Sequence, residues 1–279
     1  MRWMVVYIMI FTLAGCGYTR AKTDNDWSPE IRKLKGEVKS VKIALFRAVG
    51  ESGMAREERP KQTLISSYDR SGNKTETLIY DAEGGLMQVY RYLYDSRDNL
   101  IVRSSYLPNG TRIQKDTYKY DSKGNLIENL RNNFFLQQHT TFYVDYDKKS
   151  REQKVTRCDS DGEILAVRSF SYDRQGNKNE VSEDIELETL SYYSSVYDRN
   201  GNEIESYEHD SEGNIVSRLV TEYDNNDQVI ERISYRADGS TIRHKSYEYQ
   251  YDQKQNWIKK TEFQNSIPLS ISIREIEYY

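Results

Sequence analysis

Short segments rich in Tyr, Val, Ile and Thr alternate with polar turns over most of the chain. Leu86–Tyr94 and Thr111–Tyr120 are typical segments. Within them tyrosines recur at every second position, as at Tyr90, Tyr92 and Tyr94, so each set projects from one face of an extended backbone. The segments are too short and too often interrupted for helices, and their composition predicts β-strands.

The turns share a six-residue phrase, Tyr-Asp-x-x-Gly-Asn. Clear copies begin at Tyr68, Tyr120, Tyr172 and Tyr197. The Asp carboxylate can accept hydrogen bonds from backbone N–H groups just ahead, and the Gly can take the positive φ that closes a tight hairpin loop. Where the Gly is replaced, the substitutes are mostly Asp98, Ser150, Asp227 and Gln255. These positions are expected to be left-handed too, and Asp is among the residues that tolerate this region best.

The spacing of the phrase defines a longer repeat. Copies that start at residues 68, 80 and 94 are separated by 12 and then 14 residues, which gives a 26-residue pair of strands. The register persists where the phrase is eroded, at Tyr106 and near Asn132 and Asp184. Consecutive strands with tight turns predict an antiparallel meander of about 15 to 18 strands. The expected fold is all-β, a long meander of hairpins that forms a curved or spiralling single sheet and is possibly partly closed.

The N-terminus has the features of an export signal. A basic start is followed by the apolar segment Trp3–Leu13, which is too short to span a membrane as a helix. The sequence Leu13-Ala14-Gly15-Cys16 that ends it resembles the lipobox of bacterial lipoproteins, and this resemblance implies that Cys16 is lipidated and anchors the chain in a membrane. The alternative is an ordinary cleaved signal with a chance cysteine.

This resemblance sets the expected domains and location. Residues 1–15 would be a signal peptide, residues 16–35 a lipid-anchored polar tether, and residues 36–279 a single β domain. Gly17 is not the Asp that retains lipoproteins at the inner membrane, so the expected location is the bacterial cell envelope, at the periplasmic face or cell surface of the outer membrane.

Composition narrows the possible functions. The chain has a net charge of −4 with both signs well mixed, 30% charged residues and 24 tyrosines. Its charge pattern does not predict nucleic-acid binding. Tyrosine stands in for leucine as core material, because its ring buries apolar area while its hydroxyl can stay hydrated or hydrogen-bonded. Cys158, the only thiol besides Cys16, is interpreted as a small apolar replacement for a repeat tyrosine, with a reactive thiol as the alternative.

Candidate chemistry is sparse. The three histidines, His139, His209 and His244, are expected in different strands or turns, so they predict neither a catalytic triad nor a zinc site. Asp159–Glu163 and Asp224–Asp227 resemble calcium loops, but both lack the remaining ligands and are interpreted as solvated turns. We therefore predict no catalytic, cofactor-binding or metal-binding residues, and no enzyme.

The recurrence of the phrase from residue 68 to residue 256 resembles the YD repeats of the RHS family. That resemblance implies hairpins that wind into a curved or spiralling sheet, and an association with carbohydrate binding. Large members of the family enclose a C-terminal toxin, but only 22 residues follow Trp257 here, too few for such a cargo.

These observations lead to one favoured function and three alternatives. The favoured hypothesis is a non-enzymatic, lipid-anchored binding module for a glycan or an envelope protein. Its contact residues would be aromatic side chains outside the phrase, namely Tyr90, Tyr192, Tyr193, Tyr247 and Trp257. The alternatives are a structural or adaptor protein that pairs through its sheet edge, an RHS-like toxin-associated or immunity role, and an enzyme whose polar groups gather on one face.

Overall fold

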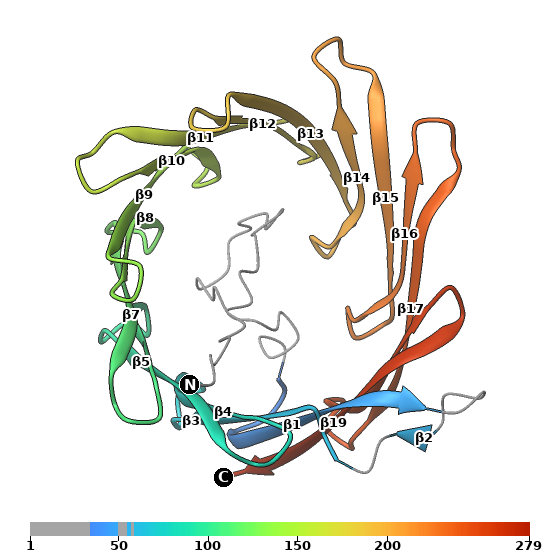
Figure 1. The fold of residues 1–279 in the computed structure, drawn as a ribbon. Coiled ribbons are helices and arrows are strands. Elements are labelled where there is room, and N and C mark those ends of the chain that lie inside the picture. Colours follow the sequence, from blue (N-terminus) through green and yellow to red (C-terminus); the bar gives the residue numbers. More distant parts are fainter. Residues whose placement is uncertain (1–33, 50–54, 57–58) are drawn as a thin grey trace, which may run out of the picture.

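The computed structural model describes residues 34–49, 55–56 and 59–279, and all of its regular structure is β (Figure 1). No helix in this part of the chain is long and apolar enough to cross a membrane. The strands are β1 (Val38–Val49), β2 (Ala55–Arg56), β3 (Gln62–Tyr68), β4 (Lys74–Tyr80), β5 (Leu86–Tyr94), β6 (Leu100–Tyr106), β7 (Arg112–Tyr120), β8 (Leu126–Asn133), β9 (Gln138–Tyr146), β10 (Glu152–Cys158), β11 (Ile164–Tyr172), β12 (Lys178–Asp184), β13 (Thr189–Tyr197), β14 (Glu203–His209), β15 (Ile215–Tyr223), β16 (Val229–Arg236), β17 (Thr241–Tyr251), β18 (Trp257–Gln264) and β19 (Ile267–Tyr278).

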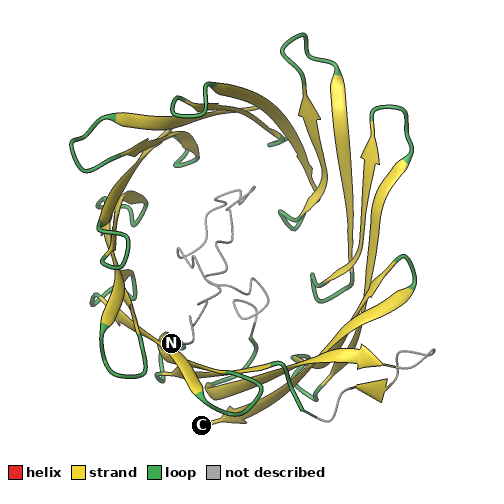
Figure 2. Cartoon of the chain, in the orientation of Figure 1, coloured by secondary structure: helices red, strands yellow, loops and turns green. Residues whose placement is uncertain are grey.

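The strands form a closed barrel. From β3 to β19 each strand pairs antiparallel with the next. β1 closes the ring, because Lys42 lies opposite Glu275 of β19 on one side and opposite Ile65 of β3 on the other. The two-residue β2 pairs only with the end of β1, so 18 of the 19 strands make the wall (Figure 2).

The predicted all-β antiparallel meander in one curved sheet is therefore confirmed, and the sheet closes fully into a barrel where a spiral or a partial closure was expected. The sheet closes completely because β1 and β19 are long and pair at nine positions, from Val38↔Tyr278 to Arg47↔Ser270, with one register shift between Val38 and Ser40. Closure leaves neither β1 nor β19 with a free edge.

The hairpins form two rims. The phrase rim consists of the hairpins after β3, β5, β7, β9, β11, β13, β15 and β17, and the opposite rim consists of those after β4, β6, β8, β10, β12, β14, β16 and β18. The eroded copies at Tyr106, Asn132 and Asp184 all lie at the opposite rim. The alternation of 12 and 14 residues along the chain is thus an alternation between the two ends of the barrel.

The turn chemistry agrees with the prediction. At the β7–β8 hairpin, Asp121 Oδ1 accepts hydrogen bonds from the backbone N–H groups of Lys123 and Asn125, both at 2.8 Å, and Gly124 has a φ of 83°. The four predicted substitutes for Gly are also left-handed, with φ of 59° at Asp98, 58° at Ser150, 55° at Asp227 and 63° at Gln255.

The phrase tyrosines connect neighbouring hairpins. The hydroxyl of Tyr120 donates a 2.8 Å hydrogen bond to the carbonyl oxygen of Leu100, in the preceding phrase-rim hairpin. Tyr146 and Tyr223 donate equivalent bonds of 2.9 Å to backbone carbonyls 20 residues earlier. Each tyrosine therefore both covers the sheet and fixes one repeat against the one before it.

The tyrosine face of the wall is the face that carries these side chains and the residues alternating with them. Its residues are the better packed, because Tyr92 and Tyr118 are buried whereas Leu93 and Lys119 on the other face are exposed. Side chains converge on the concave side of a curved sheet and diverge on the convex side, so we assign the tyrosine face to the barrel interior. Three tyrosine-rich or phenylalanine-containing clusters form the core along this inner wall.

Candidate functional site: the inner wall of the barrel

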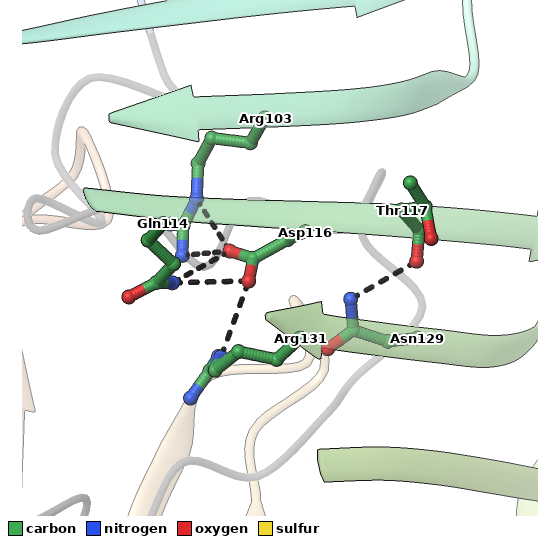
Figure 3. A network of polar contacts seen from close by, with 6 residues as sticks. All are labelled: Arg103, Gln114, Asp116, Thr117, Asn129 and Arg131. Atoms are coloured by element: carbon green, nitrogen blue, oxygen red, sulfur yellow. Dashed lines mark hydrogen bonds and ion pairs between the residues drawn. The ribbon is translucent and has the colours of Figure 1, made fainter. Parts of the chain in front are cut away.

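The inner wall carries ionic clusters among its aromatic rings. The first spans β6, β7 and β8 and is centred on Asp116, which is fully buried (Figure 3). Arg103 Nη2 and Nε lie 2.6 Å and 3.0 Å from Asp116 Oδ2, and Arg131 Nε lies 3.3 Å from Oδ1. Gln114 Nε2 donates to both carboxylate oxygens at 3.0 Å.

This cluster links neighbouring strands and carries more positive than negative charge. Two guanidinium groups share one carboxylate, and a buried carboxylate requires such partners because desolvation of its charge is costly. Alternation places all four side chains on the tyrosine face, since Arg103 lies opposite Asp116 and Asp116 lies opposite Arg131. The cluster therefore joins three consecutive strands from the inside.

A second cluster lies on β10, β11 and β12. Arg168 Nε and Nη2 make a two-pronged ion pair with Glu180, at 2.6 Å and 2.9 Å. Lys178 Nζ lies 3.9 Å from Glu180 Oε2 and 5.2 Å from the centre of the Phe170 ring. Glu152 completes the group.

Glu152 is the least satisfied of these charges. Its side chain is buried, and its Oε2 atom has no hydrogen-bond partner among the described residues. Burial raises the pKa of Glu152 to about 7, and the negative charge of Glu180 adds to that rise while Lys178 and Arg168 oppose it. Glu152 thus binds and releases a proton near neutral pH.

A third group of charged and aromatic side chains lies on β18 and β19, beside the seam where β19 pairs with β1. The guanidinium of Arg274 stacks 3.4 Å from the centre of the Trp257 ring, and Lys260 Nζ approaches the same ring at 5.7 Å. Trp257 is 4% exposed, so this indole is enclosed by cations and by Tyr249. Aromatic rings attract cations through their quadrupole, which explains how two positive groups are accommodated here.

The outer face of the wall is also charged. Ion pairs join Glu76 to Arg91 at 3.2 Å and Lys119 to Glu128 at 2.8 Å. Arg218 pairs with Glu205 at 2.7 Å, and these three pairs all alternate away from the tyrosine face. A barrel wall that faces lipid needs an outward apolar band about 25 Å tall. These three ion pairs interrupt the outer face with charge on β4–β5, β7–β8 and β14–β15.

The predicted contact residues do not converge. Tyr90 and Trp257 are buried on the tyrosine face, in β5 and β18. Tyr193 and Tyr247 also lie on that face, in β13 and β17, whereas Tyr192 alternates to the outer face. The structure therefore brings no set of these side chains together on one accessible surface.

The remaining candidates are placed as follows. His209 Nε2 contacts Ser194 Oγ at 2.8 Å, His244 Nε2 contacts Glu231 at 2.7 Å, and His139 contacts Asn132, so each histidine has a separate partner. Cys158 is a buried free thiol. Among the described residues no group of three His, Cys, Asp or Glu side chains is arranged to hold a metal ion.

The two calcium-like loops are ordinary turns. Asp159 Oδ1 accepts hydrogen bonds from the N–H groups of Asp161 and Glu163, both at 2.9 Å. Asp224 Oδ1 makes the same pair of bonds, to Asn226 and Gln228 at 2.8 Å. The Asp side chains are thus used by the turns. Cys16, the 1–15 signal and most of the 16–35 tether lie outside the described residues.

Comparison with known proteins leaves the family open. No family model matches the chain, and no curated protein matches it. A porin-like protein from Bacteroides uniformis is similar in structure, with a TM-score of 0.46 and 12% identity over 88% of this chain and 98% of that one. A protein of unknown function from Bacteroides fragilis has a TM-score of 0.17 and 13% identity over 56% of this chain and 87% of that one.

The expected RHS relationship is wrong. The sheet closes into a barrel through β1 and β19, whereas the resemblance implied a sheet that spirals. The reason is physical: the phrase specifies a tight turn and a tyrosine that bonds to the preceding hairpin, and both suit any antiparallel meander with this period. Whether the meander spirals or closes depends on how β1 meets β19.

The expected binding module and the alternative of a sheet-edge adaptor are overturned by the same closure. Tyr90, one of the expected contact residues, instead packs in a core cluster along the inner wall of an 18-strand barrel. An adaptor that pairs through its sheet edge is excluded as well, because β1 and β19 pair with each other. The toxin-associated role was implied only by the RHS resemblance.

Proposed function

We propose that this chain is a water-filled barrel, anchored at the bacterial outer membrane, that admits small hydrophilic solutes to its interior. The observation that carries the proposal is the closure of 18 strands through β1 and β19. At about 4.8 Å between strands and a tilt of about 40°, such a ring has a backbone radius on the order of 18 Å. Side chains reach only part of that distance, and barrels of this strand number enclose water.

The chemistry of the inner wall favours polar solutes. The Arg103–Asp116–Arg131 cluster and the Arg168–Glu180 pair place charges of both signs on the face that lines the interior. A wall with mixed charges and tyrosine rings is wetted readily, and it does not select one ligand as a convergent pocket would. Passage or storage of hydrophilic molecules fits this surface better than tight binding.

The proposed location rests on the sequence. Leu13-Ala14-Gly15-Cys16 is the feature that supports a lipid anchor, and Gly17 supports the outer membrane. We expect radiolabelled palmitate to be incorporated into the wild-type chain and not into a Cys16→Ala variant. Equal labelling of the two would contradict the anchor and leave the barrel itself untouched.

Fluorescence quenching tests the interior. A single cysteine carrying a fluorophore is placed either at Ser182, which alternates inward on β12, or at Ser169, which alternates outward on the adjacent β11. Cys16 and Cys158 are replaced by serine in both chains. Iodide should quench both probes, whereas a nitroxide attached to a large dextran should quench only the Ser169→Cys probe.

Two results would contradict the proposed function. If iodide fails to reach the Ser182→Cys probe, the interior is filled and admits no solute. If the dextran-bound nitroxide quenches both probes equally, the inner wall is not enclosed. The comparison is matched because the two positions lie on neighbouring strands of the same sheet.

A further inference from the structure

Exposed apolar side chains are concentrated at one end of the barrel. Every hairpin of the opposite rim carries at least one, at its tip or beside it, and the most prominent are Phe135, Leu136, Leu187, Leu190 and Ile267. Leu187, Ile267 and Phe135 are 70%, 69% and 65% exposed. At the phrase rim only Leu93, Ile127 and Tyr279 are large, apolar and exposed among the described residues.

The eroded repeats explain how this asymmetry arises. At two places on the opposite rim the polar phrase is replaced by apolar tips, Phe134-Phe135-Leu136 after β8 and Ile185-Glu186-Leu187 after β12. The hairpin geometry is retained without glycine, because Gln137 and Glu188 take the left-handed conformation with φ of 53° and 51°. These turns therefore do not need apolar side chains in order to fold, yet they expose them to water.

We propose that the opposite rim inserts these apolar tips into the surface of a lipid bilayer, so that the barrel stands on the membrane by one end while its charged wall remains in water. Only a flat surface, such as that of a bilayer, can cover all the tips of a closed ring at once. Large apolar and aromatic side chains that protrude from a polar body are the usual means of binding the interface between headgroups and acyl chains.

The shape of the rim distinguishes lipid from a second protein. The apolar tips stand on separate hairpins around the rim, and Phe135, Leu136 and Leu187 are each at least half exposed. A protein interface needs a continuous, closely packed centre with complementary pockets. Fluid lipid chains can surround isolated protrusions without such complementarity.

The wall chemistry limits the depth of insertion. The ion pairs Arg91–Glu76 and Arg218–Glu205 lie within the strands on the outer face. A charged side chain on the lipid-facing side of a barrel is costly at the centre of the bilayer and nearly neutral at its surface. Insertion therefore stops at the hairpin tips.

The expected anchor is compatible with this orientation. Lys35 N donates a 2.7 Å hydrogen bond to Asn256 Oδ1, so the chain enters the wall at the phrase rim. The intervening residues 17–33 extend to at most about 60 Å at about 3.5 Å per residue. The nine-residue β7 is about 30 Å long, so a lipid on Cys16 can reach the bilayer at either rim.

Vesicle flotation of the full chain tests this proposal. A Cys16→Ser chain removes the expected anchor, and vesicles of phosphatidylethanolamine and phosphatidylglycerol provide the bilayer. We expect this chain to float with the vesicles. Adding Phe135→Glu, Leu187→Glu and Ile267→Glu together should weaken its binding by at least about tenfold, because each change replaces an apolar tip that would enter the bilayer with a charge.

A matched control lies at the other end of the barrel. Leu93→Glu changes a leucine at the phrase rim that is 60% exposed, and it should leave flotation unchanged. Circular dichroism of both variants checks that the barrel has folded. The quenching of the Ser182→Cys probe, measured in the triple rim variant, should be unchanged, so failure of the rim proposal is distinguishable from failure of the proposed interior.

Three outcomes would overturn the rim proposal. The first is that the Cys16→Ser chain with an intact rim stays in the aqueous phase. The second is that Leu93→Glu reduces flotation as much as the triple rim variant does. The third is that the chain does not float and sediments as a dimer, which the triple rim variant converts to a monomer, because the rim would then cover a second copy.

Discussion

The hydroxyl of Tyr279 donates a 2.7 Å hydrogen bond to the backbone carbonyl oxygen of Tyr68, 211 residues earlier. Tyr68 begins the first clear copy of the phrase, and Tyr279 directly follows β19. The bond is the long-range equivalent of the one that links Tyr120 to Leu100 between neighbouring hairpins. The seam of the barrel is thus fastened by the same kind of contact that holds its repeats together.

Removing that hydroxyl should weaken the seam. Tyr279→Phe keeps the ring, which lies 4.8 Å from the guanidinium carbon of Arg70, and deletes only the hydrogen bond. We expect the free energy of unfolding to fall by about 1 kcal/mol, the usual net value of a single hydrogen bond. Urea titration followed by circular dichroism measures this change, and an unaltered midpoint would show that the bond contributes nothing to closure.

The repeat tyrosines should behave in the same way. Tyr120→Phe removes the donor to Leu100 O and should cost about 1 kcal/mol, whereas Tyr120→Ala should cost about 3 kcal/mol or more because the ring is lost as well. Tyr143→Phe is the control, since its side chain is 46% exposed on the outer face. Equal losses for Tyr120→Phe and Tyr143→Phe would contradict the role given to the phrase tyrosine.

The buried ion cluster should be sensitive to loss of its carboxylate. Asp116→Asn leaves the Arg103 and Arg131 guanidinium groups without their shared counter-charge, and we expect a loss of about 3 kcal/mol. Glu76→Gln breaks the exposed pair with Arg91 and should cost less than about 1 kcal/mol. Thermal unfolding of both variants provides the comparison, and a smaller effect at Asp116 than at Glu76 would rule out the structural role of the cluster.

Glu152 should make stability depend on pH. Burial raises its folded-state pKa to about 7 from an ordinary value of 4.5, so between these values the folded chain holds a proton that the unfolded chain has released. The contribution of Glu152 to stability is therefore complete below about pH 4.5 and is lost as the pH rises through about 7. The facing groups are Arg168 on β11, Lys178 and Glu180 on β12, and Tyr146 and Tyr172 in the adjoining strands.

The Glu152→Gln variant isolates this effect. It should match the wild type near pH 4.5 and exceed its free energy of unfolding at pH 8 by about 3 kcal/mol, because the amide carries no charge to bury. The difference between the two proteins, measured by urea titration across this range, cancels the titration of all other groups. A difference that does not change with pH would mean that Glu152 does not titrate in this window.

Local structure was largely predictable because a few neighbouring residues determine it. The Asp-x-x-Gly pattern specifies its turn through a few neighbouring atoms, so even the substitutes Asp98, Ser150, Asp227 and Gln255 were correctly placed in the left-handed region. Alternation likewise identified the two faces of each strand. Tyrosine was predicted to pack on the sheet, but its hydrogen bond to the preceding hairpin was not, because that bond depends on stagger between strands.

Closure and the interior clusters depend on distant pairs. Lys42 meets Glu275 only through the register of β1 against β19, and no local signal encodes that pairing. Arg103, Asp116 and Arg131 share a face because three successive registers agree. Charged residues an even number of positions before a phrase tyrosine, such as Asp116 four residues before Tyr120, were the available sign of a charged inner wall.

The seam between β1 and β19 provides the most direct test of the closed barrel. Lys42 and Glu275 lie opposite each other on the outer face, and their exposed ion pair of 3.2 Å can be replaced with little loss of stability. In a chain with Cys16 and Cys158 replaced by serine, Lys42→Cys and Glu275→Cys should be joined by a short thiol crosslinker within one molecule, as peptide mass spectrometry would show. The pair Lys42→Cys and Lys154→Cys, on separate parts of the wall, should not. Efficient crosslinking of the first pair alone is the result that the closed barrel predicts, and its absence from folded, monomeric protein would show that the sheet is open.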